Sequence, residues 1–296
     1  MSKGKVKADL LLLLAAAIWG FAFVAQRVGM DYVGPFTYNG VRFSLGILVL
    51  LPFLYNKFRK REQLVYNLNP AERRKIFAGS LVAGLLLFTG VALQQLGLMK
   101  TTAGKAGFLT ELYVAFVPLI GLCFGQRNNW FIWAGVFLSM AGLYFLCITK
   151  GFSLAPGDSL VVMCSFVFTF HVLIIGWLSP KMDSILLALI QFSVTAGLNL
   201  AVAFAMETVT TVRIMNAWLP IAYGGILSVG IAYTLQVMAQ KTAHAAYVSI
   251  ILGLEAVFAV IGGILLLGET MSIRMLGGCA LMLTGTILVQ LKGQST

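Results

Sequence analysis

The sequence is organised by long apolar runs, and the most informative of them extends from residue 245 to residue 267. This run contains one carboxylate, Glu255. A helix that begins near His244 rises by about 1.5 Å per residue, which places Glu255 roughly 16 Å along its axis. That depth is close to the middle of a hydrocarbon core about 30 Å thick. Because a charge is costly there, we expect Glu255 to face the interior of a helix bundle or a watery cavity.

Apolar runs of similar length recur along the whole chain and predict an all-α membrane protein with ten transmembrane helices. One of these runs carries a second acid, Glu111, at a depth comparable to that of Glu255. The connections are short, except for residues 56–75. The predicted spans cover residues 8–28, 35–55, 76–98, 103–124, 129–148, 158–178, 184–206, 216–239, 244–267 and 272–291.

Composition and charge agree with this interpretation. Hydrophobic residues make up 59% of the chain, charged residues 10%, and the mean hydropathy is +0.93, values that are atypical of soluble domains. The net charge of +11 predicts topology rather than a nucleic-acid partner, because most basic residues fall on one side of the ten spans. The inner segments hold Lys3, Lys5, Lys7, Lys57, Arg59, Lys60, Arg61, Arg73, Arg74, Lys75, Arg127, Lys181, Lys241 and Lys292, and the outer segments hold Lys100, Lys150, Arg213 and Arg274.

This charge bias predicts that both termini are cytoplasmic and that the protein lies in the cell (inner) membrane. The basic start and first apolar run also fit a secretory signal peptide. Ten spans satisfy the charge bias and nine do not, so we interpret the run as a retained first span.

The two halves of the chain show signs of an internal repeat. Gly125, Gly135 and Gly142 align with Gly268, Gly278 and Gly285 at a constant offset of 143 positions. Earlier in each half, Trp19 aligns with Phe168 and Arg42 with Gln191 at another common offset. Residues 1–150 and 151–296 therefore each contain five spans. Because five is odd, the second half enters the membrane from the opposite side, which predicts two inverted five-helix repeats.

Several stretches give the chain a resemblance to the EamA-like branch of the drug/metabolite transporter superfamily. They are WGFAF at residues 19–23, VRFSLG at 41–46, AGFLTELYVAFVPLIGL at 106–122 and SIILGLEAVFAVIGGILLLGET at 249–270. The resemblance implies ten helices, a central cavity lined mainly by the first, third, fourth, sixth, eighth and ninth spans, scaffold roles for the fifth and tenth, and export of small metabolites. Gln126 departs from the acid that would match Glu269, and Glu111 stands where such sequences often carry a small residue.

Polar and aromatic residues at membrane depth are the candidates for a binding site. Each has a structural alternative, in which it joins two helices. Arg42 is the one deep cation, and its counter-ion could belong to the protein or to a substrate. His171 could carry a proton or donate a packing hydrogen bond. The candidate substrate-binding residues are Trp19, Gln26, Arg42, Gln94, Gln95, Glu111, Tyr113, His171, Tyr233, Gln236 and Glu255.

Glu111 is the predicted proton-coupling residue, and Glu255 is predicted to be mainly structural. Burial disfavours the charged form of a carboxyl group, so Glu111 can be neutral in a closed cavity and ionised when water enters. Pro118 lies in the same span and permits a bend there, so this span is the candidate gating element.

Together these features predict a secondary active transporter that exports small zwitterionic or neutral amphipathic metabolites, such as amino acids, by alternating access, with proton coupling as the hypothesis for its energy source. The expected partners are this small-molecule substrate and the lipid bilayer; a homodimer stays open. An ion channel or facilitative pore is the alternative, although no filter segment or ring of like residues stands out. A membrane-embedded enzyme is more distant, since HExxH, GxSxG and P-loop motifs are missing from the sequence. We expect no catalytic residue, metal or cofactor.

Overall fold

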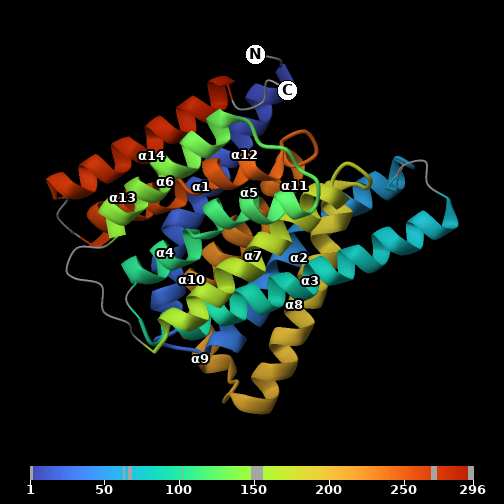
Figure 1. The fold of residues 1–296 in the computed structure, drawn as a ribbon. Helices are drawn as coiled ribbons and strands as arrows, with labels where there is room; N and C mark the ends of the chain where they lie inside the picture. Colours follow the sequence, from blue (N-terminus) through green and yellow to red (C-terminus); the bar gives the residue numbers. More distant parts are fainter. Residues whose placement is uncertain are drawn as a thin grey trace.

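The computed structural model describes residues 3–62, 64–65, 69–101, 103–147, 156–267 and 272–292, which form a bundle of helices (Figure 1). Within these residues nine helices are long and apolar enough to cross a membrane, and Trp130–Leu146 forms a shorter apolar helix. The described chain contains no strand, only an isolated bridge between Val65 and Met182. The prediction of an all-α membrane protein is therefore confirmed.

Seven of the ten predicted spans each correspond to one continuous helix. These are α1 (Lys3–Gly29), α2 (Pro35–Arg59), α3 (Pro70–Leu98), α6 (Trp130–Cys147), α7 (Asp158–Leu178), α8 (Ser184–Met206) and α14 (Ile273–Lys292). A short helix, α9 (Thr211–Asn216), precedes the eighth span. The predicted repeat boundary at residues 150 and 151 lies outside the described residues, as does Gly268.

The other three spans are not regular α-helices, which the apolar pattern does not reveal. Two of them are interrupted, and the third changes its winding part-way. The fourth span comprises α4 (Ala103–Glu111) and α5 (Tyr113–Cys123); the ninth comprises α12 (Ala245–Leu252) and α13 (Glu255–Leu267); the eighth comprises α10 (Trp218–Ala222), the π-helix η1 (Tyr223–Tyr233) and α11 (Thr234–Ala239). Glu111 and Glu255 thus stand at the two interruptions.

The interruption of the fourth span lies at Leu112 and not at Pro118, where a bend was expected. Helix α5 continues through Pro118, so the one backbone hydrogen bond that proline removes does not end the helix. At Leu112 the carbonyl accepts from the N–H groups of both Ala115 and Phe116, which starts a new helix. The break in the fourth span therefore lies six residues before the proline.

Helices α6 and α14 pack through glycines at reciprocal positions. A Cβ atom on Gly142 would lie 2.5 Å from the carbonyl oxygen of Gly278, and one on Gly278 would lie 2.6 Å from that of Gly142. Gly135 and Gly285 make the same kind of contact, at 3.2 and 3.0 Å. The offset of 143 positions relates Gly142 to Gly285 and Gly135 to Gly278, so it converts one of these two contacts into the other. A two-fold relation between the halves would produce this reciprocity, although the inverted repeat itself stays a prediction.

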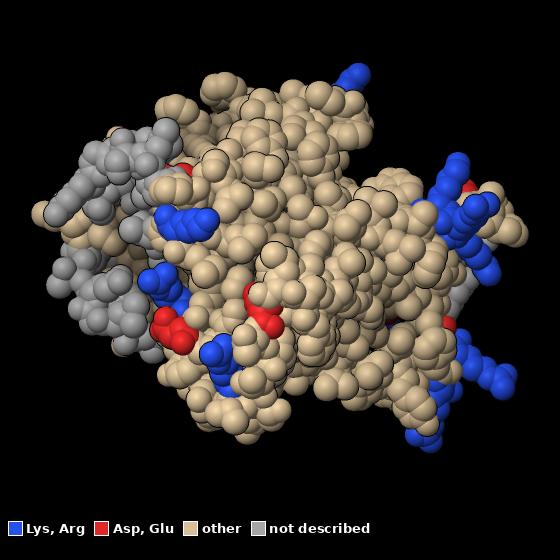
Figure 2. Space-filling model, turned by 90° about the horizontal axis from the view of Figure 1, so that it is seen from below, with Lys and Arg blue, Asp and Glu red and all other residues tan. Residues whose placement is uncertain are grey.

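The larger group of basic side chains lies at one end of the bundle, a smaller group lies beside acidic side chains toward the other end, and the surface between them is mostly uncharged (Figure 2). Lys57 near the end of α2 pairs with Glu62 at 2.7 Å and with Asp183 at 3.1 Å. The N–H group of Asp183 donates to the Leu64 carbonyl at 2.8 Å. The segments after α2 and before α8, both predicted to be cytoplasmic, therefore lie together.

Glu207 holds the start of α2 from the end of α8. Its carboxylate accepts hydrogen bonds from the N–H of Phe36 at 2.9 Å and from the N–H and Oγ1 of Thr37 at 2.8 and 2.6 Å. An acid at a helix N-terminus satisfies free N–H groups and interacts favourably with the helix dipole.

We expect Glu207→Ala to lower the melting temperature of the purified protein in detergent by roughly 2 to 6 °C, because a lost N-terminal cap costs about 1–2 kcal/mol. Glu62→Ala is the matched control, since it removes an exposed ion pair that is worth little. Equal effects of the two substitutions would contradict the capping role.

Candidate functional site

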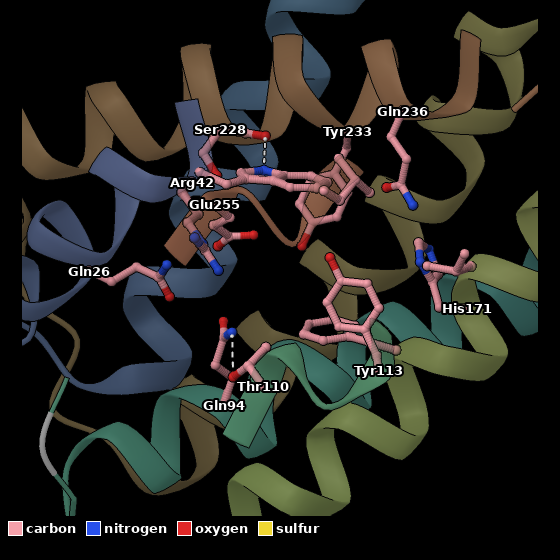
Figure 3. Close-up of a pocket in the computed structure, with 14 residues that line it drawn as sticks. Gln26, Arg42, Gln94, Thr110, Tyr113, His171, Ser228, Tyr233, Gln236 and Glu255 are labelled. Carbon is pink, nitrogen blue, oxygen red and sulfur yellow. Dashed lines mark hydrogen bonds between the residues drawn. The ribbon is translucent and has the colours of Figure 1, made fainter. Parts of the chain in front are cut away.

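A cavity lies inside the bundle, where both interrupted spans and the π-helix meet α1, α2, α3 and α7 (Figure 3). Its lining residues are Trp19, Gln26, Arg42, Gln94, Thr110, Tyr113, Phe168, His171, Val172, Ser228, Tyr233, Gln236, Leu252 and Glu255. The cavity volume is about 50 Å³. One water molecule needs about 10–15 Å³ on this scale, so the space suits a few waters and must widen to hold a metabolite.

Nine of the eleven predicted binding residues line this cavity, and Gln95 and Glu111 do not. Both exceptions are fully buried behind the wall. Arg42 adds the second span to the cavity, beyond the spans that the resemblance implies. The sequence reasoning missed Thr110, Phe168, Val172, Ser228 and Leu252. Phe168 could have been found from the repeat, because it aligns with Trp19.

The carboxyl groups of Glu111 and Glu255 lie next to each other at the two helix breaks. Glu111 is the last residue of α4, and Glu255 is the first residue of α13. The two carboxyl groups are close enough to interact electrostatically. The breaks themselves are in contact, because a Cβ atom on Gly253 would lie 2.9 Å from Val114 Cγ2 and 3.5 Å from Glu111 Oε2.

The two acids differ in their access to the cavity. Glu255 is partly exposed and lines the wall, whereas Glu111 is fully buried behind it. Within the described chain no Lys or Arg lies within 4.0 Å of either carboxyl group. Neither oxygen of Glu111 accepts a hydrogen bond from a described donor. The two carboxyl groups repel each other when both are ionised, so their proximity favours one proton shared by the pair.

An aromatic wall forms one side of the cavity. Trp19 Nε1 donates to the Ser228 carbonyl at 3.2 Å, and its ring centre lies 4.6 Å from that of Tyr233. The Tyr233 ring also contacts Phe43 in a tilted arrangement and His171 edge to face. Figure 3 shows the hydroxyl groups of Tyr113 and Tyr233 directed toward one another. Ser228 and Tyr233 both belong to the π-helix, a form of winding that is frequent at functional sites.

The polar residues of the wall divide into those held by the protein and those left open. His171 Nε2 lies 2.8 Å from Gln191 Oε1, the contact expected of a packed histidine. Gln94 Nε2 donates to Thr110 Oγ1 at 3.4 Å. Gln26 Oε1 is buried and has no partner among the described residues. The cavity therefore keeps at least one unused acceptor, while His171 is already engaged.

The second histidine, His244, lies outside the membrane spans, at the start of α12. Burial lowers its pKa below the usual 6.5, so it is neutral at pH 7. Among the described residues, no group of three or more His, Cys, Asp and Glu side chains is placed to hold a metal ion.

Comparison with known proteins identifies the family. The model of the EamA-like transporter family matches residues 6–148 and again residues 155–291. The chain belongs to the EamA-like transporter family. It is 30% identical to an uncharacterized transporter of Archaeoglobus fulgidus, over 97% of this chain and 87% of the relative. It is 24% identical to the uncharacterized inner membrane transporter YedA of Escherichia coli (strain K12), over 86% of this chain and 81% of the relative.

A solved structure titled "Crystal structure of protein" has the same fold, with a TM-score of 0.79 over 97% of each chain at 18% identity. The resemblance predicted from the motifs is confirmed. As a member of the EamA-like family, the protein is a multi-pass membrane transporter.

Proposed function

We propose that this EamA-like protein is a secondary active transporter that exports small metabolites, amino acids among them, by alternating access coupled to protons. The observation that carries the proposal is the Glu111–Glu255 pair, which joins two helix breaks beside the central cavity. A proton-coupled transporter needs a protonatable group that is accessible from only one side of the membrane at a time.

Alternating access is supported by three features of the bundle. The family model matches each half of the chain, and the reciprocal glycine contacts of α6 and α14 fit two pseudo-equivalent halves. Discontinuous helices near the membrane midplane are typical of such transporters. The cavity is also too narrow for an amino acid, so that passage requires the helices around it to move.

Proton coupling is assigned to the acid pair rather than to Glu111 alone. Glu255 faces the cavity and exchanges protons with water that enters it, while Glu111 lies behind and shares the proton when the cavity is dry. This assignment gives Glu255 a direct role in place of the mainly structural one expected from the sequence. His171 is the weaker candidate, because Gln191 already engages its ring nitrogen.

The proposed location is the cell (inner) membrane, with both termini in the cytoplasm. The relative YedA is named an inner membrane transporter, and the positive-inside rule assigns the basic end of the bundle to the cytoplasm. Reporter fusions after Lys75 and Lys181 should therefore read as cytoplasmic, and a fusion near Arg213 as external. A cytoplasmic signal at Arg213 would contradict both the topology and the inverted repeat.

The function is tested with the purified protein in lipid vesicles and a panel of radiolabelled amino acids. A pH gradient should drive accumulation of at least one of them against its concentration gradient, and a protonophore should abolish the accumulation. Transport that only equilibrates the two sides would favour the facilitative pore instead.

A further inference from the structure

We infer that Arg42 is the anchor for a substrate carboxylate, and that the substrate class is a small monocarboxylate with an apolar body, such as an apolar amino acid. The inference rests on the proposed transport function and names the chemical group that the cavity selects. It follows from how Arg42 is held, from which of its donors remain unused, and from the charge of the cavity as a whole.

Among the residues that the structure describes, Arg42 has no acidic partner. Its side chain is only 2% exposed, and no carboxylate of the described residues lies within 4.0 Å of it. A buried cation without a counter-ion is costly. An anion that enters the cavity would supply the missing partner.

The surrounding residues fix the guanidinium group and leave its outer edge available. Arg42 Nε donates to Asn39 Oδ1 at 3.1 Å, and Asn39 Nδ2 in turn donates to the Val91 carbonyl at 3.3 Å. The guanidinium carbon lies 5.2 Å from the ring centre of Tyr38 and 5.3 Å from that of Phe43. One edge and the flanks of the group are thereby occupied. The two terminal nitrogens form a fork that matches a carboxylate with two parallel hydrogen bonds.

Neighbouring amides complete a polar end of the cavity around Arg42. Figure 3 shows Gln26, Gln94 and Arg42 pointing into one opening. Gln26 Oε1 is buried without a partner among the described residues, so the amide is free to turn toward a ligand. An amide can donate to a carboxylate oxygen or accept from a polar hydrogen of the same ligand.

The charge of the cavity limits the anion to a single negative charge. Arg42 is the one Lys or Arg among the described lining residues, so the wall offers a single positive charge to an anion. A phosphate group with nearly two charges would remain undercompensated in such a site, whereas a carboxylate would be matched. The remaining wall is aromatic or aliphatic, with Trp19, Phe168, Val172 and Leu252, which suits an apolar body.

The experiment measures binding to the full-length protein in detergent, through the change in melting temperature with ligand concentration. The probes are leucine, phenylalanine and methionine, each with its deaminated acid and its decarboxylated amine. We expect at least one amino acid and its deaminated acid to bind, and the corresponding amine to bind at least tenfold more weakly.

Substitutions then assign the preference to Arg42. Arg42→Gln should weaken carboxylate binding by roughly 10- to 100-fold, the effect of losing a charge-assisted bidentate contact, and should not weaken binding of the cationic amine. Arg42→Lys keeps the positive charge but loses the forked pair of donors, so its carboxylate affinity should lie between those of the unchanged protein and Arg42→Gln. Arg27→Gln is the matched control, because Arg27 is exposed and contacts the Leu98 carbonyl away from the cavity.

Asn39→Asp tests the inference if Arg42 substitutions do not fold. It keeps the arginine and places a carboxylate where the Asn39 oxygen now accepts from Nε, so the protein itself supplies the counter-ion. Carboxylate binding should fall at least tenfold while the protein remains folded.

The inference is overturned if no carboxylate binds, if amines bind as well as acids, or if Asn39→Asp and Arg42→Gln leave carboxylate affinity unchanged. These outcomes are distinct from failure of the proposed function. Carboxylate binding that depends on Arg42, without accumulation driven by a pH gradient, would retain the anchor and remove only proton coupling.

Discussion

Glu111→Gln and Glu255→Gln should each abolish the accumulation of substrate that a pH gradient drives, while exchange of substrate across the membrane continues. A glutamine at either position keeps the shape of the side chain, and its NH₂ group can donate to the remaining carboxylate in place of the shared proton. The contact between the two helix breaks is thereby kept, but the shared proton is lost.

The expected size of the effect follows from the driving force. A gradient of one pH unit is worth about 1.4 kcal/mol per proton and supports about tenfold accumulation when one proton is exchanged per substrate. Both variants should reduce this ratio to one, as measured with radiolabelled substrate in vesicles. Glu62→Gln, at an exposed ion pair, is the control and should behave as the unchanged protein. Full accumulation by Glu111→Gln would contradict the shared-proton mechanism. Full accumulation by Glu255→Gln alone would assign proton coupling to Glu111 by itself.

Gly20→Val should strongly reduce the yield of folded protein. A Cβ atom on Gly20 would lie 2.6 Å from Phe258 Cβ and 2.7 Å from both Ala259 N and the Glu255 carbonyl oxygen. Two of these three atoms belong to the backbone of α13 and cannot rotate away. The branched side chain would push α1 from α13 beside the cavity, at a cost of at least about 1–3 kcal/mol.

The matched control for this substitution is Gly197→Val in α8, because no atom lies within 4 Å of a Cβ atom there. Size-exclusion chromatography of fluorescent fusions should report a large loss of the folded peak for Gly20→Val and little change for Gly197→Val. Equal yields would contradict the close contact between α1 and α13.

The membrane spans could be predicted from the sequence because the hydrocarbon core imposes length and apolarity on each of them. The same physics identifies the candidate site, since a buried Gln, Arg or Glu is costly and must face a partner or a cavity. This is why Gln26, Arg42, Gln94 and Glu255 could be chosen before their neighbours were known. For Arg42 the sequence left open a counter-ion in the protein or in the substrate, and the described residues contain no carboxylate within 4.0 Å of it.

The helix breaks could not be predicted from apolar patterning, because residues on both sides of a break are equally apolar. Gly253 is a weak signal, since glycine lowers helix stability, and Leu112 gives no local signal at all. Pro118 is the strongest local breaker in the fourth span, yet α5 passes through it. The contact between Glu111 and Glu255 depends on where both breaks fall and on how the two half-helices cross. Sequence spacing alone carries no such information.

Proton release on substrate binding tests the shared proton most directly. The purified protein is held in weakly buffered detergent solution near neutral pH, and the amino acid that raises its melting temperature most is added while the pH is recorded. The mechanism predicts that substrate binding opens the acid pair to water and releases up to one proton per protein, and that Glu111→Gln and Glu255→Gln release none. No release from the unchanged protein, or equal release from both variants, would contradict it.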